Sequence, residues 1–332
     1  MSQQPVNPIE LANGITLSPE EQRKLSWTGD HSAEWFSRLP GLILDWCERW
    51  KITLDSERPA INFNLVLFGV SEELGPVAIK TSPPHREVTA EIEAVRLSQG
   101  PGVVRLFESD PDVAYMIQER VIPGIMLRQH IDSGDIDDVQ ATTIAATCMK
   151  RFWSPAPHND KLITLREWFK ALYEHRDLHQ GDGRIPTACI DLAVHHADHL
   201  LATEQDRVTV HGDLNPGNIL RNQKGGWTII DPKGLAAERG YEIGQWMLNP
   251  YGLHTWPNLV EVLDTRLDLL STQLELDRYR LWQWSVAHSM LSECWTVAGD
   301  AVDAEGLHCV EILDALCQLP EARRDSELRG GR

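Results

Sequence analysis

Residues 208–220 of the chain read VTVHGDLNPGNIL, and residues 227–234 read WTIIDPKG. Two short β-type runs flank a polar loop, and a second Asp comes directly after the next apolar run. Asp213, within the loop, is suited to accept a proton from a hydroxyl group, as a general base does. Asn218, five residues later, and Asp231 offer the hard oxygen ligands that Mg²⁺ prefers. Protein kinases combine the same parts at the same spacing, so the pattern predicts metal-assisted phosphoryl transfer.

A simple turn is the alternative interpretation of this loop, because Asp, Asn, Pro and Gly are the usual turn-forming residues. A turn alone requires neither an Asn five residues after Asp213 nor an Asp at the end of the next strand, so the functional interpretation is favoured. His211 has a different expected role. We expect it to hydrogen-bond the backbone near Asp231 rather than to act as a general base.

The segment HGDLNPGN at residues 211–218 resembles the catalytic loop of the aminoglycoside phosphotransferases and related small-molecule kinases. It has His-Gly-Asp where protein kinases have His-Arg-Asp, and residues 231–234 have Asp-Pro-Lys-Gly in place of Asp-Phe-Gly. The runs IDPKGLA (230–236), YEIG (241–244) and NP (249–250) are similar to the streptomycin 6-kinase branch, also called the aminoglycoside/hydroxyurea resistance kinases.

This resemblance continues more weakly from about Trp35 to about Leu316 and implies an α+β, two-lobed protein-kinase-like fold. The N-lobe would be small, with an antiparallel sheet, and the C-lobe larger and mainly helical. We expect an N-terminal arm and N-lobe over residues 1–118, the hinge over 119–124 and the C-lobe over 125–332. The implied activity is Mg²⁺-dependent transfer of the γ-phosphoryl group of ATP to a hydroxyl group of an aminoglycoside. Streptomycin is the first candidate for this acceptor, and the implied biological role is antibiotic resistance.

A VAIK sequence ends at Lys80, and alone it indicates only an edge strand that ends in a solvated Lys. Together with the downstream loop, Lys80 resembles the strand lysine that holds the α- and β-phosphates in kinases. Its carboxylate partner is expected on the following helix, where Glu87, Glu91 and Glu93 are the candidates. The family pattern favours Glu91, which stands four residues before the apolar Val95, and leaves the other two as surface charges.

The loop that covers the phosphates lacks the Gly-x-Gly-x-x-Gly signature of protein kinases, since no such run precedes Lys80. Small-molecule kinases of this type often lack that signature, so its absence does not exclude the kinase interpretation. The loop is expected at residues 60–64, where Asn62 and Asn64 are possible donors to the phosphates.

The adenine ring is expected between the lobes, hydrogen-bonded to backbone groups of the hinge. Met116 or Ile117 would take the gatekeeping position, and Gln118, Glu119 and Val121 would supply hinge groups. Backbone recognition leaves no side-chain signature in a sequence, so the choice of ATP over GTP rests on the resemblance alone.

Candidates for contacting the acceptor, besides Asp213, each have a structural alternative. Lys233 could reach the transferring phosphate or hold its loop, or it could be a solvated turn residue. Glu242 could accept a substrate ammonium, guanidinium or hydroxyl group, or it could cap a helix, and the structural role is slightly favoured. Glu293, together with Trp295 on the same late helix, could line the acceptor pocket.

The formal net charge is −18, from 31 Lys and Arg and 49 Asp and Glu residues. This charge argues against a nucleic-acid partner, which needs a basic surface, and it suits a small cationic substrate, although solubility alone also explains it. The six scattered Cys include no Cys-x-x-Cys pair and are expected to be reduced thiols. With no secretory signal and no apolar run of the ~18 residues that span a membrane, we expect a cytoplasmic enzyme without membrane contact or obligate protein partner.

Apolar spacing predicts the order of the secondary structure. Residues 1–30 are expected to form an arm or a loosely packed helix, and residues 321–332 to fray. Strands are expected at 61–70, 77–80, 103–107 and 114–118. Helices are expected at 35–50, 87–99, 135–153, 164–176, 186–203, 257–275, 276–299 and 305–319.

The helix at 186–203 contains His195 and His199 at a spacing that could bind a metal. It lacks the Glu of a His-Glu-x-x-His motif and is expected to pack behind the catalytic loop. Surface or core histidines are therefore the favoured interpretation.

Three other functions use a similar set of residues. The first is a kinase of the same fold that acts on another hydroxylated metabolite, and substrate-binding helices carry no readable code to exclude it. The second is a nucleotide-binding pseudokinase, although all the core residue types are present. The third is a protein kinase, but little room follows Asp231 for an activation loop and no Ala-Pro-Glu occurs there.

Overall fold

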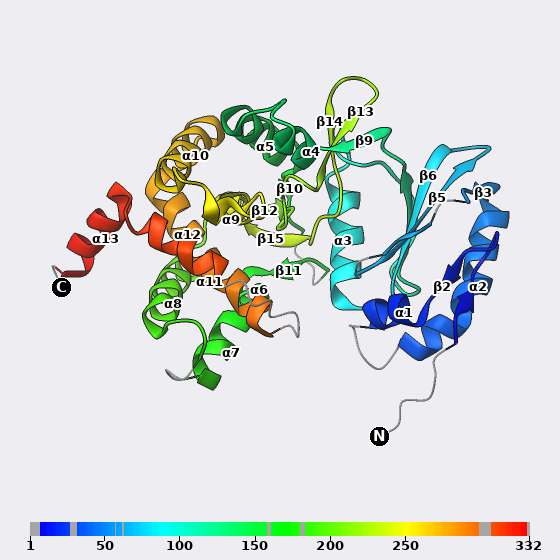
Figure 1. Ribbon diagram of the computed structural model, residues 1–332, viewed down its shortest axis with the longest axis horizontal. Coiled ribbons are helices and arrows are strands. Elements are labelled where there is room, and N and C mark those ends of the chain that lie inside the picture. Colours follow the sequence, from blue (N-terminus) through cyan, green and yellow to red (C-terminus); the bar gives the residue numbers. More distant parts are fainter. Residues whose placement is uncertain are drawn as a thin grey trace.

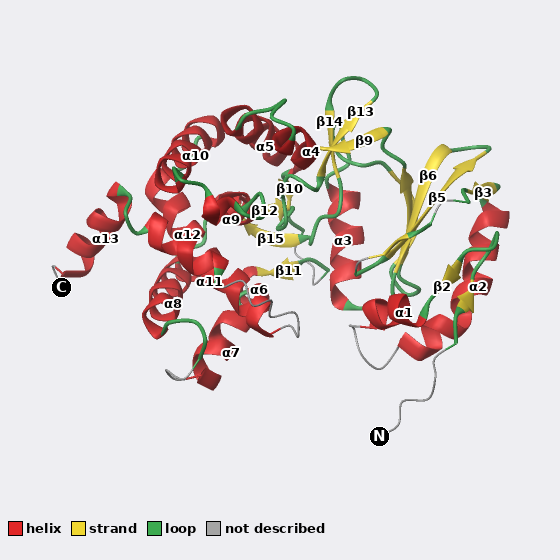
Figure 2. Ribbon diagram, viewed as in Figure 1, coloured by secondary structure: helices red, strands yellow, loops and turns green. Residues whose placement is uncertain are grey.

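The protein folds into two lobes that are joined by a short connection (Figure 1). The computed structural model describes residues 7–26, 32–56, 58–61, 63–157, 161–179, 183–298 and 307–330. The smaller, N-terminal lobe is built on an antiparallel sheet, and the larger C-terminal lobe is mainly helical (Figure 2). This is the α+β, kinase-like arrangement that the sequence predicts. No helix of the described chain has the length and apolar character needed to cross a bilayer.

The N-lobe sheet has the strand order β3-β5-β6-β8-β7, with β4 paired to β5, and all its pairs are antiparallel. Its strands are β3 (Ile52–Leu54), β4 (Ala60–Ile61), β5 (Leu65–Ser71), β6 (Gly75–Thr81), β7 (Leu106–Asp110) and β8 (Tyr115–Glu119). Alternate side chains of a strand face opposite sides. Val77 and Ile79 pack with α2 (Ser32–Arg49) on one face, and Met116 packs with α3 (Arg86–Leu97) on the other.

The N-terminal segment is more ordered than the predicted loose arm. It forms a hairpin of β1 (Ile9–Glu10) and β2 (Thr16–Leu17), followed by α1 (Pro19–Leu25). Ser18 and Glu21 form a capping box at the start of α1, which satisfies backbone groups at the helix end. Leu17 and Leu25 are fully buried against α2, so the segment belongs to the N-lobe core. The rest of the predicted arm lies outside the described residues.

The connection between the lobes is shorter than the predicted hinge of residues 119–124. β8 ends at Glu119, and β9 (Pro123–Met126) already pairs with β13 (Ile219–Asn222) of the C-lobe. β13 in turn pairs with β14 (Trp227–Ile229), so the predicted catalytic loop and metal loop join a small sheet next to the hinge. Residues 120–122 are left to connect the lobes.

The C-lobe packs helices around a second sheet, which has the order β10-β12-β15-β11. Its strands are β10 (Ser154–Pro155), β11 (Ile163–Thr164), β12 (Arg207–Val210) and β15 (Leu235–Glu238). The helices are α4 (Leu127–Asp132), α5 (Asp138–Phe152), α6 (Leu165–Trp168), α7 (Lys170–His179), α8 (Thr187–Ala202), α9 (Gly244–Leu248), α10 (Leu259–Leu274), α11 (Arg278–Ala298), α12 (His308–Leu316) and α13 (Pro320–Gly330), with 3-10 turns η2 (Arg239–Ile243) and η3 (Leu253–Thr255). α11 is the central helix, since it buries Trp282 and Trp284 on opposite sides.

The C-terminal segment corrects the prediction that residues 321–332 fray. The described part forms helix α13, which is held by polar contacts with the start of α11. Arg278 Nε lies 2.8 Å from Glu321 Oε1, and the hydroxyl group of Tyr279 donates to Asp325 Oδ1 at 2.8 Å. Because these contacts join charged side chains rather than an apolar stripe, the polar sequence gave no periodicity by which to recognise the helix.

Candidate active site

The catalytic loop leaves β12 at Val210, and His211 is buried beneath it. His211 Nε2 lies 2.8 Å from the backbone oxygen of Ile230, and Asp213 N donates to His211 Nδ1 at 3.2 Å. Burial lowers the pKa of His211 to about 4, so the ring is neutral at pH 7. Neutral His211 therefore accepts at one nitrogen and donates at the other, which ties the catalytic loop to the residue before Asp231. This is the structural role expected for His211.

Glu242, in η2, supports the same loop from inside the lobe. Its carboxylate accepts hydrogen bonds from His211 N at 2.7 Å and from Gly212 N at 2.9 Å. Burial raises the pKa of Glu242 to about 7, and these two backbone donors oppose the rise. Both oxygens face the loop backbone and the side chain is buried. Of the two roles that the sequence left open, a substrate contact or structural support, these contacts correspond to structural support.

Asp213 lies in the catalytic loop, and two asparagine side chains donate hydrogen bonds to it. Asn218 Nδ2 donates to the backbone oxygen of Asp213 at 2.9 Å, and Asn215 Nδ2 lies 3.2 Å from Asp213 Oδ1. Burial raises the pKa of Asp213, and the nearby ammonium group of Lys233 opposes the rise. A carboxylate that holds a proton more readily is a stronger base, which suits the predicted role. The sequence analysis missed Asn215, although an Asn before Pro-Gly is a known signal for a side chain that caps its own turn.

The metal loop and the N-lobe meet at Lys80. Lys80 Nζ lies 2.6 Å from Glu91 Oε1 on α3 and 2.8 Å from Asp231 Oδ1 on the loop. Burial disfavours the charged form of Lys80, but the two carboxylates outweigh it and hold its pKa above the ordinary value. The pKa of Asp231 is lowered: burial raises it, and the charge of Lys80 more than compensates. Among the three candidate glutamates, Glu91 is the one in contact with Lys80.

Asp231 and Asn218 provide a donor set that fits Mg²⁺. The Asp231 side chain is 45% exposed while one of its oxygens contacts Lys80, so carboxylate surface remains open to a cation. Asn218 directs its amide nitrogen to Asp213, which leaves its amide oxygen available as a ligand. A carboxylate and an amide oxygen, completed by water and phosphate, are the ligands expected for Mg²⁺. Asp231 also adopts a left-handed backbone with φ of +59°, a conformation that is uncommon for residues other than Gly and is more frequent for Asp than for most.

Lys233 connects the metal loop to the N-lobe. Its Nζ lies 2.9 Å from Glu87 Oε2 on α3 and 5.9 Å from the ring centre of Phe63, which is within the predicted phosphate loop. Lys233 is therefore paired rather than freely solvated, and it stands between the two lobes. Glu87, one of the three candidate partners of Lys80, is thus used by a different lysine.

The register of the N-lobe sheet distinguishes the two candidates for the gatekeeping position. Met116 is the direct neighbour of Lys80 across β6 and β8, and Gln118 is the neighbour of Ala78, so these side chains share the face of the lysine. Ile117 points to the opposite face and packs in the cluster that contains α2. Met116 is therefore the candidate on the nucleotide side.

The remaining nucleotide-site candidates lie around the same cleft. Gln118 is buried at the end of β8, and Glu119 N already donates to Arg105 O at 2.9 Å, so that backbone donor is used within the N-lobe. Val121 lies in the connection between the lobes and is partly exposed. Asn64 is partly exposed just before β5, while Asn62 lies outside the described residues.

Glu293 lines a cavity of about 240 Å³ in the C-lobe. The side chain is 2% exposed, and its Oε2 accepts a hydrogen bond from Cys309 N at 2.7 Å. The cavity lies between α9, η3 and the C-terminal end of α11, and its other polar lining residues include Gln245, Asn249, Ser292 and His308. Trp295 does not line it and packs instead on Trp168, 4.8 Å between ring centres.

The fold and this convergence of side chains define a protein-kinase-like phosphotransferase. The chain matches the family described as "Aminoglycoside/hydroxyurea antibiotic resistance kinase" over residues 49–299, and it belongs to this family. It is therefore a nucleotide-using kinase that phosphorylates a hydroxyl group of a small molecule.

Curated relatives cover most of the chain at low identity. It is 26% identical to the streptomycin 6-kinase of Streptomyces glaucescens, over 81% of this chain and 86% of that protein. It is also 26% identical to the streptomycin 6-kinase of Streptomyces griseus, over 87% of this chain and 93% of that one. The hydroxyurea phosphotransferase of Kitasatospora aureofaciens is 28% identical, over 82% of this chain and 78% of that protein.

Solved structures support the fold. Choline kinase LicA from Streptococcus pneumoniae superimposes with a TM-score of 0.54 at 13% identity, covering 84% of this chain and all of that one. Aminoglycoside phosphotransferase APH(4)-Ia, in a ternary complex with ADP and hygromycin B, gives a TM-score of 0.52 at 12% identity, over 82% of this chain and 97% of that one. At these identities the likeness concerns the fold alone.

Proposed function

We propose that this chain transfers the γ-phosphoryl group of ATP to a hydroxyl group of an aminoglycoside, with streptomycin as the first candidate. The observation that carries the proposal is the contact of Lys80 with both Glu91 and Asp231, at 2.6 Å and 2.8 Å. Lys80 and Glu91 are 11 residues apart and Asp231 lies 151 residues beyond Lys80, yet the three meet as the phosphate-handling groups of a kinase do. The streptomycin 6-kinases among the relatives support the choice of acceptor.

Each residue of the centre has a distinct role in this proposal. Lys80, oriented by Glu91, binds the α- and β-phosphates of the nucleotide. Asn218 and Asp231 hold Mg²⁺, which when bound neutralises charge on the phosphate oxygens. Asp213 orients the acceptor hydroxyl group and takes its proton. Because the transition state of phosphoryl transfer is loose, most of the rate enhancement comes from positioning and charge neutralisation.

Lys233 has a proposed role at the phosphate that is transferred. It stands beside Asp213, whose pKa its charge affects, and it is held by Glu87. A cation in this place would stabilise negative charge that develops between nucleotide and acceptor. The same contact with Glu87 also holds the metal loop against α3, so both functions that the sequence suggested for Lys233 are compatible.

The acceptor is proposed to enter the cavity that Glu293 lines. Arg128 supports this proposal because it contacts both regions: its N donates to Pro216 O of the catalytic loop, and a guanidinium nitrogen lies 3.4 Å from the backbone oxygen of Tyr251, a lining residue. The carboxylate of Glu293 and the overall charge of −18 favour a cationic acceptor, because negative charge attracts cations.

A second acceptor has a specific observation in its favour. The hydroxyurea phosphotransferase relative matches this chain at 28% identity, slightly above the streptomycin 6-kinases. Hydroxyurea is small and neutral, so it needs neither the length of the cavity nor the carboxylate of Glu293. The kinase chemistry proposed for Asp213, Lys80 and Asp231 is the same for both acceptors.

The experiment is a coupled ATP-turnover screen over aminoglycosides, hydroxyurea and other hydroxylated metabolites, run with Mg²⁺ and with EDTA. We expect ADP release that depends on streptomycin and on Mg²⁺. In Asp231→Ala, which lacks the metal carboxylate, turnover should fall to background. Turnover with hydroxyurea but not with streptomycin would replace the first acceptor by the second. Turnover that persists in EDTA would refute the metal role of Asp231 and Asn218.

A further inference from the structure

A second cluster of metal-ligand side chains lies on the C-lobe, away from the cleft. It consists of His195 and His196 on α8 and Asp325 on α13, and their ligand atoms lie within 4.8 Å of one another. His196 and Asp325 are buried, and His195 is exposed. α13 extends from the end of the C-lobe that faces away from the N-lobe (Figure 1), so this cluster is separate from the proposed Mg²⁺ site.

His196 presents an unpaired nitrogen to the cluster. Its side chain is fully buried, and within the described residues its Nε2 has no hydrogen-bond partner. The other nitrogen, Nδ1, lies 3.3 Å from the amide of Gln283, which orients the ring. An unpaired buried nitrogen is costly unless something binds it.

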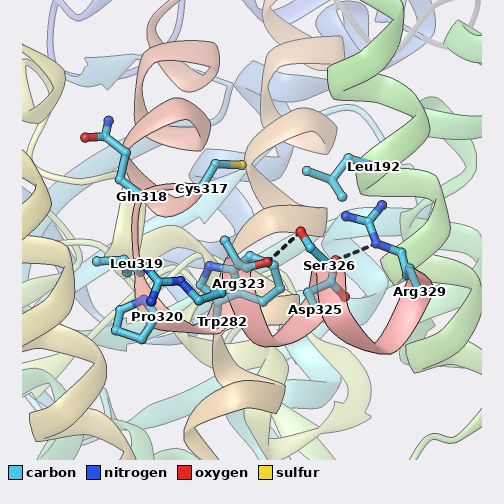
Figure 3. Close-up of a pocket in the computed structure, with 11 residues that line it drawn as sticks. Leu192, Trp282, Cys317, Gln318, Leu319, Pro320, Arg323, Asp325, Ser326 and Arg329 are labelled. Atoms are coloured by element: carbon cyan, nitrogen blue, oxygen red, sulfur yellow. Dashed lines mark hydrogen bonds and ion pairs between the residues drawn. The ribbon is translucent and has the colours of Figure 1, made fainter. Parts of the chain in front are cut away.

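Asp325 supplies the carboxylate that faces this nitrogen. Its Oδ2 lies 3.7 Å from His196 Nε2, while its Oδ1 accepts a hydrogen bond from the hydroxyl group of Tyr279 at 2.8 Å. Arg329 Nε pairs with Oδ2 at 2.7 Å (Figure 3), and the Arg329 side chain is 45% exposed in the last turn of α13. Tyr279 therefore fixes one oxygen of the carboxylate, and a metal ion on the other oxygen would have to displace Arg329.

We propose that His195, His196 and Asp325 bind a divalent transition-metal ion of the zinc class, which fastens α13 to α8. Imidazole and carboxylate ligands favour such ions over Mg²⁺ or Ca²⁺. Zinc lies about 2.0–2.2 Å from nitrogen and oxygen ligands, so two ligands of one ion stand about 3.3 Å apart. The 3.7 Å between His196 Nε2 and Asp325 Oδ2 is close to that spacing. Gln283 and Tyr279 orient the two buried ligands, as outer groups do in metal sites.

The simpler alternative is an ionic network without metal, in which Arg329 neutralises Asp325. This network leaves His196 Nε2 unpaired and gives the exposed His195 no role. A metal ion would bind all three side chains and would take the place of Arg329 as the partner of Asp325. The two alternatives differ in one measurable property, which is stoichiometric binding of a metal ion.

The experiment uses the full chain without a histidine tag, stripped of metal with a chelator and dialysed. Zn²⁺ binding is followed by calorimetry and thermal unfolding, and Co²⁺ binding by its visible absorbance. We expect one equivalent of Zn²⁺, and a rise in the unfolding temperature that grows with free Zn²⁺. His195→Ala should weaken binding at least tenfold. Because His195 is exposed, this variant should fold as the wild type does.

Two matched variants test whether the binding belongs to this cluster. His199→Ala removes an exposed histidine one turn further along α8, and His308→Ala disrupts the pair that His308 forms with His254, 4.1 Å between ring centres. Both variants should keep wild-type Zn²⁺ affinity. The inference is overturned if the wild type binds no Zn²⁺, or if His195→Ala binds as tightly as the wild type. Loss of binding in His308→Ala alone would assign the metal to the other pair.

Discussion

Gly234 and Ala90 approach so closely that no β-carbon fits between them: one built on Gly234 would lie 2.2 Å from the backbone oxygen of Ala90. Gly234 also has a φ of +71°, which residues with a β-carbon rarely adopt. Ala90 directly precedes Glu91, and Gly234 follows Asp231 by three residues. This contact therefore sets the separation of the two carboxylates that hold Lys80.

Gly234→Ala should lower both stability and turnover. The added methyl group must push the metal loop away from α3, which parts Asp231 from Glu91. We expect a loss of about 1–3 kcal/mol in the free energy of unfolding and a fall in kcat of at least about tenfold. Gly225→Ala is the matched control, because Gly225 has a similar φ of +74° but its nearest neighbour would be 3.8 Å away. Equal effects of the two substitutions on kcat would argue against the contact as the cause.

The Lys80–Glu91 ion pair should matter for nucleotide use and not for stability alone. Lys80→Met removes a charge that meets the phosphates in ground and transition states, so we expect kcat/KM for ATP to fall by about 10² or more. Glu91→Gln should cause a smaller fall, since Asp231 still holds the lysine. Steady-state kinetics at saturating acceptor measure both. Lys51→Met breaks an exposed Lys–Glu pair of similar length, 2.8 Å to Glu73, and should leave kinetics unchanged.

Glu242→Gln separates a supporting role from a substrate contact. A neutral amide cannot accept two backbone donors with both of its groups, so one N–H of the loop loses its partner. We expect a loss of about 1–3 kcal/mol in unfolding free energy and a lower kcat, with the KM for the acceptor unchanged. A rise in acceptor KM at constant kcat would instead make Glu242 a substrate ligand.

Stability should fall in acid partly because of His211. The pKa of its ring is about 4 in the native state against an ordinary value of 6.5, since burial disfavours the charged form. Between these values the unfolded chain binds a proton that the native chain does not, so the free energy of unfolding decreases as the pH falls through this window. The full loss, present below about pH 4, is about 3 kcal/mol.

Urea unfolding followed from pH 7 to pH 4 measures this contribution. The slope of the unfolding free energy against pH reports how many more protons the unfolded chain binds than the native chain. In His211→Gln this number should be smaller by up to about one. His199→Gln, at an exposed position of α8, is the control and should keep the wild-type slope. An unchanged slope in His211→Gln would show that other groups determine the loss of stability between pH 7 and pH 4.

Local sequence patterns indicated only part of the proposed catalytic centre. Asp213 and Asn218 lie within one loop, so their spacing indicated them, whereas Lys80, near the end of β6, was indicated only together with that downstream loop. The choice among the glutamates was harder, because Glu87 and Glu91 stand one turn apart on the same face of α3. Family resemblance favoured Glu91, and the distances agree: Glu91 meets Lys80, and Glu87 meets Lys233.

The features that the sequence did not predict depend on tertiary contacts. Glu242 supports a loop that precedes it by about thirty residues, and no local pattern reports such a hydrogen bond. The assignment of Met116 rather than Ile117 needed the pairing register of β6 and β8. Helix α13 is held by ion pairs and a tyrosine hydroxyl, and its order could not be read from apolar periodicity.

The central claim is phosphorylation of streptomycin with Asp213 as the base. The most direct measurement is mass spectrometry of streptomycin after incubation with ATP, Mg²⁺ and either the wild-type enzyme or Asp213→Asn. We predict a mass gain of one phosphoryl group with the wild type and a rate about 10²–10⁴ lower with the variant, at a similar KM for ATP. The proposed acceptor would be contradicted if streptomycin stayed unmodified while the enzyme transferred the phosphoryl group to a neutral metabolite. A variant with wild-type kcat would contradict the role of Asp213.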